Sequence, residues 1–158
     1  MTIVAGIITP DFTGMGSDSL AADDDIASIT ASPKVMKFGE LIIGFSGNFR
    51  VGQQFFKYAS KVTSPSLEQI LENTKVEGDD WQLLAIEKGR LYEITSDKGI
   101  LESIKTKGRA YGAIGSGASV ALGALYVSSE DEGALMRALE ASAEHCTSVR
   151  GPFKIMSL

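Results

Sequence analysis

The sequence predicts an α+β domain in which two mostly antiparallel sheets stack face to face, with a pair of helices outside each. Two observations predict this class. Apolar segments of strand length and segments with helical spacing follow one another in the order strands, two helices, strands, two helices, strand. The 158 residues suit one hydrophobic core, and no linker, repeat or low-complexity tract divides them, so we expect a single domain over 1–158.

The first half of the chain begins with apolar, partly β-branched segments that predict strands. In order, strands are expected over 2–8, 12–22, 26–30, 34–38 and 41–45. Thr9–Pro10–Asp11 and Gly39–Glu40 have the composition of turns, and the second of these predicts a hairpin. We expect the first four of these strands to form a meander, which returns their residues to the side of the N-terminus.

The rest of the chain alternates between helical spacing and further strands. Helices are expected over 48–61, 67–71, 118–127 and 131–146, and strands over 81–86, 90–95, 111–114 and 153–158. Ser64 or Ser66 would cap the second helix. Ser129 with Glu132 has the spacing of a capping box for the last helix.

Composition and charge exclude several classes of function. The net charge is −5 and the isoelectric point is about 4.9, with no basic stripe, so we expect no nucleic-acid partner. No segment has the length of a membrane span or the form of a signal peptide, and no cluster has metal-ligand spacing. The single cysteine, Cys146, rules out an intramolecular disulfide and favours a reducing compartment. We therefore expect a cytoplasmic protein with no membrane contact, metal or cofactor.

Three residues together predict a nucleophilic site. Thr2 directly follows Met1, Asp18 lies sixteen positions later in GSDSLA, and Lys34 lies thirty-two positions after Thr2 in SPKVMKF. Threonine is a weak nucleophile and needs a base, which the α-amine of Thr2 would supply once Met1 is removed. A neighbouring Lys⁺ would lower the pKa of both the amine and the hydroxyl, and Asp18 would hold that lysine in place.

These residues and their order resemble the proteasome β-subunit and the HslV-type peptidase, which are N-terminal-nucleophile hydrolases. The segments that carry the resemblance are TIVAG, GSDSLAA, PKVMKF, IIGFSGN and AIGSGAS, and together they cover most of the chain. The resemblance implies a four-layer αββα sandwich and amide hydrolysis through a covalent acyl-enzyme. It implies Thr2 as nucleophile and base, Asp18 and Lys34 as its electrostatic support, the backbone N–H of Gly44 as oxyanion donor, and Ser116 near the Thr2 amine.

Two parts of the family pattern are less closely matched. The family has an Asp followed three residues later by Ser near the end of its last long helix. Here Ser148 matches the serine, but His145 stands at the Asp position and Glu144 lies one place away, so Glu144 and Ser148 are the candidate supporting residues. Arg50, after the GFSGN turn, would line a specificity pocket for acidic residues or be a solvated residue at a helix start.

The function that the residues and the resemblance together imply is a threonine peptidase. The resemblance implies that it works in a self-compartmentalised homo-oligomeric ring and takes unfolded protein or peptide as substrate. The resemblance also implies an ATP-dependent unfoldase as a partner. Two alternatives stay open: a non-catalytic ring subunit with the same fold, which a retained Met1 would favour, and an N-terminal-nucleophile amidase that acts on a small amide.

Overall fold

The structure, a computed structural model, describes residues 2–23, 26–97, 99–128 and 132–158. In chain order these residues form β1 (Val4–Ile8), β2 (Thr13–Ser17), β3 (Leu20–Asp23), β4 (Ile26–Ile29), β5 (Val35–Phe38), β6 (Leu41–Gly47), α1 (Phe49–Ala59), α2 (Leu67–Asn73), β7 (Trp81–Glu87), β8 (Arg90–Thr95), β9 (Gly99–Glu102), β10 (Ala110–Ile114), α3 (Ala118–Val127), α4 (Glu132–His145) and β11 (Lys154–Ser157). The α+β class with antiparallel sheets is as predicted.

The first sheet has the strand order β10-β1-β2-β11, and all of its pairs are antiparallel. β1 is buried along its whole length because β2 and β10 flank it and apolar layers cover both of its faces. β2 places Gly16 against α4, where an added Cβ would lie 2.7 Å from Leu139 Cδ1. The antiparallel pairing of β1 with β2 places the start of the chain beside the end of β2.

The second sheet has the order β5-β6-β7-β8-β9, again antiparallel. The hairpin predicted at Gly39–Glu40 joins β5 to β6. β7 and β8 meet at Lys88 and Gly89, whose φ angles of 50° and 70° are those of a tight hairpin turn. The sequence analysis did not predict β9, since its four residues are exposed and lack alternation.

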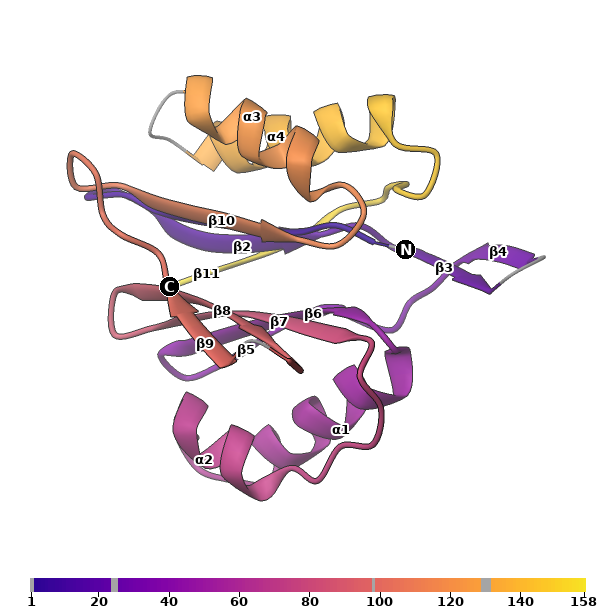
Figure 1. Cartoon of the computed structure of the whole chain (residues 1–158). Helices are drawn as coiled ribbons and strands as arrows, with labels where there is room; N and C mark the ends of the chain where they lie inside the picture. The colour runs from indigo at the N-terminus through magenta and orange to yellow at the C-terminus, as the bar shows by residue number, and fades with distance from the viewer. Residues whose placement is uncertain (1, 24–25, 98, 129–131) are drawn as a thin grey trace.

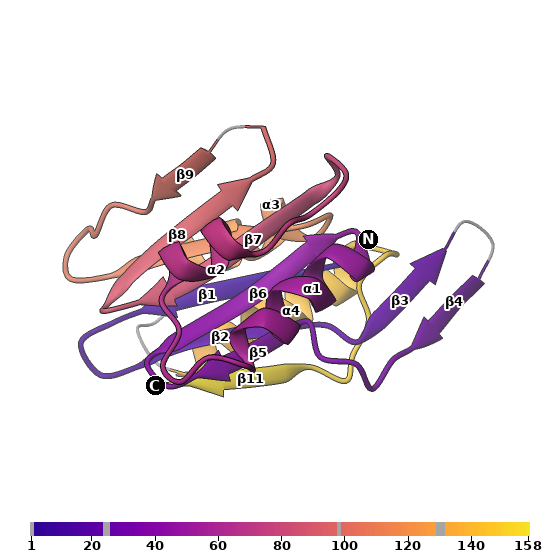
Figure 2. The same cartoon turned by 90° about the horizontal axis from the view of Figure 1, so that it is seen from below.

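The predicted meander of the first four strands is wrong. The expected strand over 12–22 divides into β2 and β3, because Asp18 and Ser19 leave the ladder. Asp18 uses its carboxylate to accept N–H groups from Ile3 and Leu20, while Ser19 bonds to the carbonyls of Arg150 and Pro152. β3 and β4 then form a separate hairpin, and β5 begins the second sheet (Figure 2).

Side-chain caps begin the first two helices. The Asn48 side chain accepts the N–H groups of Arg50 and Val51 at the start of α1. Of the two serines expected to cap α2, Ser66 is the cap, and with Gln69 it forms a capping box. The capping box expected at Ser129 lies outside the described residues. None of the described helices is both long enough and apolar enough to cross a membrane.

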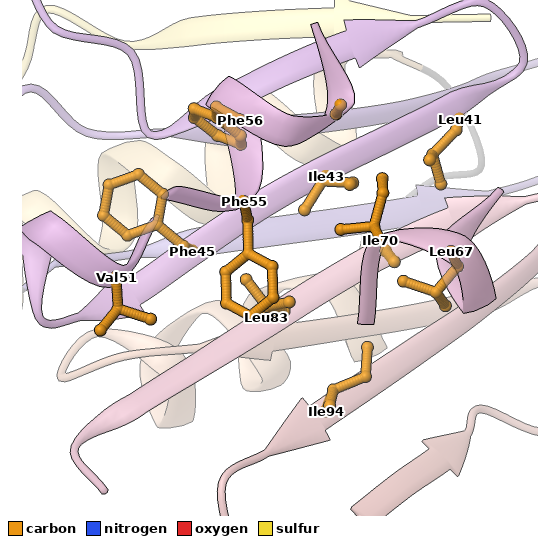
Figure 3. Packing of buried hydrophobic residues seen from close by; sticks show 12 residues of the cluster. Leu41, Ile43, Phe45, Val51, Phe55, Phe56, Leu67, Ile70, Leu83 and Ile94 are labelled. Carbon is orange, nitrogen blue, oxygen red and sulfur yellow. The ribbon is translucent and has the colours of Figure 1, made fainter. Parts of the chain in front are cut away.

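Three apolar clusters hold these elements together. In Figure 1, α3 and α4 lie over the outer face of the first sheet, while α1 and α2 lie below the second. Figure 3 shows the cluster beneath the second sheet, where Phe45, Phe55 and Ile70 meet between the strands and the two helices. A second cluster joins the first sheet to α3 and α4, and a third, with Met15 and Val35, lies between the sheets.

Candidate functional site

Thr2, Asp18 and Lys34 meet at one edge of the interface between the two sheets. Thr2 precedes β1 and Asp18 follows β2, and the pairing of Val4 with Ser17 brings these two strand ends together. Lys34 precedes β5 of the second sheet. All three residues are buried, at 3%, 1% and 3% exposure. The stacking of the sheets, rather than a meander, therefore brings the lysine to the threonine.

The three side chains form a closed triangle of hydrogen bonds. The Thr2 hydroxyl donates to Asp18 Oδ1 over 2.5 Å and accepts from Lys34 Nζ over 2.6 Å. Lys34 Nζ also donates to Asp18 Oδ1 over 2.8 Å. The hydroxyl oxygen therefore faces a positive charge while its proton faces a negative one. The Lys34 ammonium stabilises negative charge as it develops on Oγ1, while the Asp18 carboxylate holds both the ammonium and the hydroxyl in place.

Lys34 has an acceptor for each proton of an ammonium group. Besides Thr2 Oγ1 and Asp18 Oδ1, Nζ donates to the backbone carbonyl of Leu20. Burial lowers the pKa of Lys34 from its ordinary value of 10.5, and the hydrogen bond and charge of Asp18 oppose that shift. The three acceptors favour the charged form and fix the ammonium beside Thr2.

The turn formed by Gly115, Ser116 and Gly117 encloses the backbone of Thr2. The N–H of Thr2 donates to Ser116 Oγ over 3.2 Å. Ser116 Oγ lies 3.2 Å from the Thr2 carbonyl oxygen, which also accepts from the N–H of Gly117 over 3.3 Å. Ser148 Oγ lies 2.8 Å from Ser116 Oγ. Ser116 thus lies beside the nitrogen of Thr2, and Ser148 is linked to that nitrogen through Ser116.

The geometry does not support the oxyanion role expected of Gly44. Gly44 lies in the middle of β6, and the next N–H along, that of Phe45, donates to the carbonyl of Lys34 on the β5 side. Because N–H directions alternate along a strand, the N–H of Gly44 points to β7, where Leu84 is its partner. Gly44 instead makes room between the sheets, since an added Cβ would lie 2.4 Å from Val4 Cγ1.

The same alternation indicates Gly47 as the glycine whose N–H is directed toward the site. Gly47 ends β6, is exposed, and has a φ angle of +91°. Its N–H points to the same side of β6 as that of Phe45, the side from which Lys34 reaches Thr2. The strand register decides which of the two N–H groups, that of Gly44 or that of Gly47, points to the site, and the register cannot be read from the sequence.

Two of the expected residues lie away from these contacts. Glu144 is exposed on the last turn of α4 and, within the described part of the chain, makes no hydrogen bond to Thr2, Lys34 or Ser116. Arg50 is exposed in the first turn of α1, three residues after Gly47, as a solvated residue at a helix start would be.

Two residues that the sequence analysis did not select contact the turn around Thr2. The N–H of Gly115 donates to Gln82 Oε1 of the second sheet over 3.3 Å, so a side chain from β7 holds the turn that follows β10. Cys146 Sγ lies 4.0 Å from the carbonyl oxygen of Ser116. Neither has a signal in the sequence, because each depends on a contact between segments more than 25 residues apart.

The fold of this chain is shared by several solved structures, although no family model and no curated protein matches its sequence. A complex of Thiobacillus denitrificans BPH with epoxomicin has a TM-score of 0.79 at 16% identity, and the match covers 99% of this chain and 97% of that one. Eukaryotic HslV from Trypanosoma brucei has a TM-score of 0.75 at 14% identity, with 99% and 98% covered. Anbu, an ancestral beta-subunit from Yersinia bercovieri, has a TM-score of 0.70 at 16% identity, with 98% and 81% covered. This chain therefore has the fold of HslV and Anbu.

Proposed function

We propose that this chain is a threonine peptidase of the N-terminal-nucleophile class, with the αββα sandwich of that class, and that Thr2 becomes its first residue when Met1 is removed. One observation carries the proposal. The Thr2 hydroxyl lies 2.6 Å from a buried ammonium and 2.5 Å from a buried carboxylate, just before β1, an inner strand of its sheet. The fold shared with HslV supports it.

The proposed reaction begins at the amine that loss of Met1 frees. The Thr2 hydroxyl turns its proton from Asp18 Oδ1 to this amine, which takes the proton while Oγ1 forms a bond to the substrate carbonyl carbon. The charged Lys34 lowers the pKa of the amine, so that more of it is neutral near pH 7. The N–H of Gly47 donates to the oxyanion of the tetrahedral intermediate, a kind of contact whose loss typically costs about 10²–10³ in rate.

The same amine completes the reaction. It gives its proton to the leaving nitrogen as the C–N bond breaks, which leaves an ester between the acyl group and Oγ1. A water molecule then attacks the ester carbonyl, its proton passes to the amine, and that proton returns to Oγ1 as the acid product leaves. Ser116 Oγ, 3.2 Å from the Thr2 nitrogen, orients the amine through both steps. Asp18 holds Lys34 and carries no proton in this scheme.

We further propose that copies of the chain assemble into a ring that encloses these sites, in the cytoplasm, with peptide or unfolded protein as substrate and an ATP-dependent unfoldase as its partner. The outer face of α3 supports self-association, because Leu122, Tyr126 and Val127 are exposed there at 37%, 70% and 79% and α3 has no charged residue. Sedimentation velocity would detect a ring, and a monomer at micromolar concentration would contradict it.

The decisive test compares chains that differ only at the N-terminus. A fusion to a removable ubiquitin-like tag yields the protein with Thr2 first, and its mass is checked intact. We expect this form to hydrolyse fluorogenic peptide amides, a form that keeps Met1 to be inactive, and Thr2→Ala to be inactive with an unchanged circular dichroism spectrum. Thr63→Ala, at an exposed threonine, is the matched control.

The outcomes of this test separate the alternatives. Turnover by Thr2→Ala equal to that of the parent would refute the mechanism. Hydrolysis of small amides without any hydrolysis of peptides would assign an amidase. A folded, Thr2-first chain that hydrolyses neither class of amide would be a non-catalytic subunit. A denaturing quench after a peptide ester is added should trap an acyl group on Thr2, visible as a mass increase.

A further inference from the structure

The strand β9 forms one edge of the second sheet, and no described strand pairs with its outer side. β9 pairs with β8 on one side, and the strand order places it last in the sheet (Figure 2). The N–H of Ser103 donates to the carbonyl of Leu91 on the β8 side. By alternation, the N–H groups of Ile100 and Glu102 point outward, away from β8. A further strand therefore finds main-chain donors along this edge.

Apolar side chains remain exposed along the same segment. Ile100 and Leu101 are 55% and 54% exposed, and Ile104 is 87% exposed. Edge strands in monomeric proteins are usually protected from pairing by charges, proline or a covering segment, and the lysines near this edge could protect it in this way. The three large aliphatic side chains within five residues have the opposite effect, because exposed apolar side chains favour contact with a partner.

A cationic groove lies at the end of this edge. It has a volume of about 510 Å³ and is lined by Lys88, Arg90 and Lys105 together with Glu102 and Ile104. Arg90 lies 3.6 Å from Glu102, but both side chains are about half exposed or more, so this ion pair is weak and Arg90 can turn to another carboxylate. Within the described residues, neither Lys88 nor Lys105 lies within ion-pair distance of a carboxylate. The groove is positive in a chain whose net charge is −5.

The groove and the candidate site lie at opposite ends of the second sheet. Gly47 and Trp81 pair at the end near Thr2, while Leu41 and Glu87 pair at the end near the groove. The seven residues of β6 separate these ends by about 20 Å. A ligand in the groove therefore does not occupy the position of a substrate at Thr2.

We propose that the edge of β9 and this groove bind an extended acidic segment of a partner protein, which adds to the sheet as a further strand. Its backbone pairs with Ile100 and Glu102, its apolar side chains cover Ile100 and Ile104, and its carboxylates face the cations of the groove. Nucleic acid fits less well, because it has neither a backbone that continues a β-ladder nor side chains that cover the isoleucines. The inference does not depend on peptidase activity.

The probe is a fluorescein-labelled decapeptide of alternating Glu and Val, whose binding is followed by fluorescence anisotropy. We expect saturable binding that weakens as NaCl is raised, because the cations are exposed to solvent. The Lys–Val counterpart should not bind. A Glu–Pro decapeptide keeps the charge but has few main-chain donors, and it should bind at least about tenfold more weakly.

Protein variants test the two parts of the site separately. The double variant Lys88→Glu/Lys105→Glu should weaken binding at least about tenfold, while Lys57→Glu/Lys61→Glu, at exposed lysines on and just after α1, should leave it unchanged. Ile100→Pro removes one outward donor and keeps the pairing with β8, since edge strands tolerate such a proline. Ile100→Pro should also weaken peptide binding. Ile100→Thr keeps the N–H, so it should weaken peptide binding less than Ile100→Pro does.

Several results would overturn the proposal. The first is no binding of the Glu–Val decapeptide at 0.5 mM. The second is binding of the Glu–Pro peptide as tight as that of the Glu–Val peptide. The third is binding of single-stranded dT10 that is as tight as that of the Glu–Val peptide, or tighter. Self-association that Ile100→Pro abolishes, without any peptide binding, would assign the edge to a second copy instead. Thermal unfolding of each variant shows whether a loss of binding is local. Peptide hydrolysis by the Thr2-first form is measured in parallel, so a failure of the groove and a failure of the proposed activity remain distinct.

Discussion

Lys34 and Asp18 are buried together, so each charge depends on the other for its stability. In the variant Lys34→Met, the Asp18 carboxylate keeps its backbone donors but loses its counter-ion. We expect the free energy of unfolding to fall by about 3–5 kcal/mol, because a buried charge is left uncompensated. Peptide turnover should fall below detection, since the Thr2 hydroxyl loses the ammonium. Urea unfolding and peptide hydrolysis measure the two effects.

The double variant Lys34→Met/Asp18→Asn separates stability from activity. It removes both charges and leaves an amide that still bonds to the nearby N–H groups through its oxygen. We expect it to recover a large part of the lost stability and none of the turnover. Recovery of turnover in the double variant would show that Lys34 serves the fold rather than the reaction.

The lowered pKa of Lys34 gives the reaction an alkaline limit. The proposed mechanism needs a neutral Thr2 amine and a charged Lys34, so kcat/KM should rise with pH as the amine loses its proton and fall as Lys34 loses its own, below pH 10.5. Thr2→Ser, which keeps the amine and Lys34, should keep both limbs of the profile. A profile that stays flat from pH 8 to beyond pH 10.5 would contradict the role of the ammonium.

The sign for stability follows from the same shift. Burial makes the pKa of Lys34 lower in the folded state than in the unfolded state, so between these two values the unfolded chain binds more protons. The contribution of Lys34 to the free energy of unfolding therefore increases as pH rises through that window toward 10.5. The difference in unfolding free energy between the parent and Lys34→Met should shift in favour of the parent over this alkaline range.

Sequence reasoning placed Thr2, Asp18, Lys34, Ser116 and Ser148 in one neighbourhood, because their spacing resembles that of a known family. It assigned the oxyanion donor to Gly44, whereas the strand register favours Gly47. The direction of a backbone N–H depends on strand register, which distinguishes Gly44 from Gly47 although both follow the same apolar segment. The catalytic roles of these residues remain predictions until the variants above are measured.

At the scale of elements, apolar spacing predicted the four helices to within a few residues. At the starts of α1 and α2 a capping side chain also marks the boundary. Apolar spacing merged β2 with β3, since Asp18 and Ser19 leave the ladder through tertiary contacts to Ile3 and Arg150 that no local pattern contains. It missed β9 because the four residues of this exposed edge strand do not alternate between apolar and polar.

The turn at Gly115 shows how one element depends on its backbone conformation. Gly115 has a φ angle of +94°, and an added Cβ would lie 2.4 Å from the Thr2 carbonyl oxygen. We expect Gly115→Ala to lower the free energy of unfolding by about 1–3 kcal/mol from backbone strain alone and to displace Ser116 from the Thr2 nitrogen. Differential scanning calorimetry and peptide hydrolysis should both report the loss.

Gly123 provides the matched control for this substitution. It lies in α3, is exposed, and has no atom within 4 Å of an added Cβ. Gly123→Ala should therefore raise the free energy of unfolding, by up to about 1 kcal/mol, through helix propensity, and leave hydrolysis unchanged. If both alanine variants are equally stable and active, the close contact between the turn and Thr2 is not what constrains Gly115.

At the scale of the molecule, the candidate site exists only where the two sheets are stacked. Thr2 and Asp18 come from the first sheet and Lys34 from the second. Sequence patterns predicted that two sheets would stack, but they assigned the first four strands to one meander. Local periodicity specifies a strand and its buried face, whereas the sheet to which it belongs is decided by long-range packing such as that of Val35 against Met15 and Val4.

This division predicts that equal losses of core packing affect activity unequally. Met15 lies between the sheets beside Gly44, while Ile70 lies in the cluster under the second sheet, and both are fully buried. Met15→Ala and Ile70→Ala should each lower the free energy of unfolding by about 2–5 kcal/mol. Only Met15→Ala should also lower kcat at a temperature at which circular dichroism shows both variants folded, because its cavity loosens the stacking that holds Lys34 against Thr2. Equal kcat values in the two variants would show that the ion pair alone, without the packing between the sheets, fixes the geometry of the site.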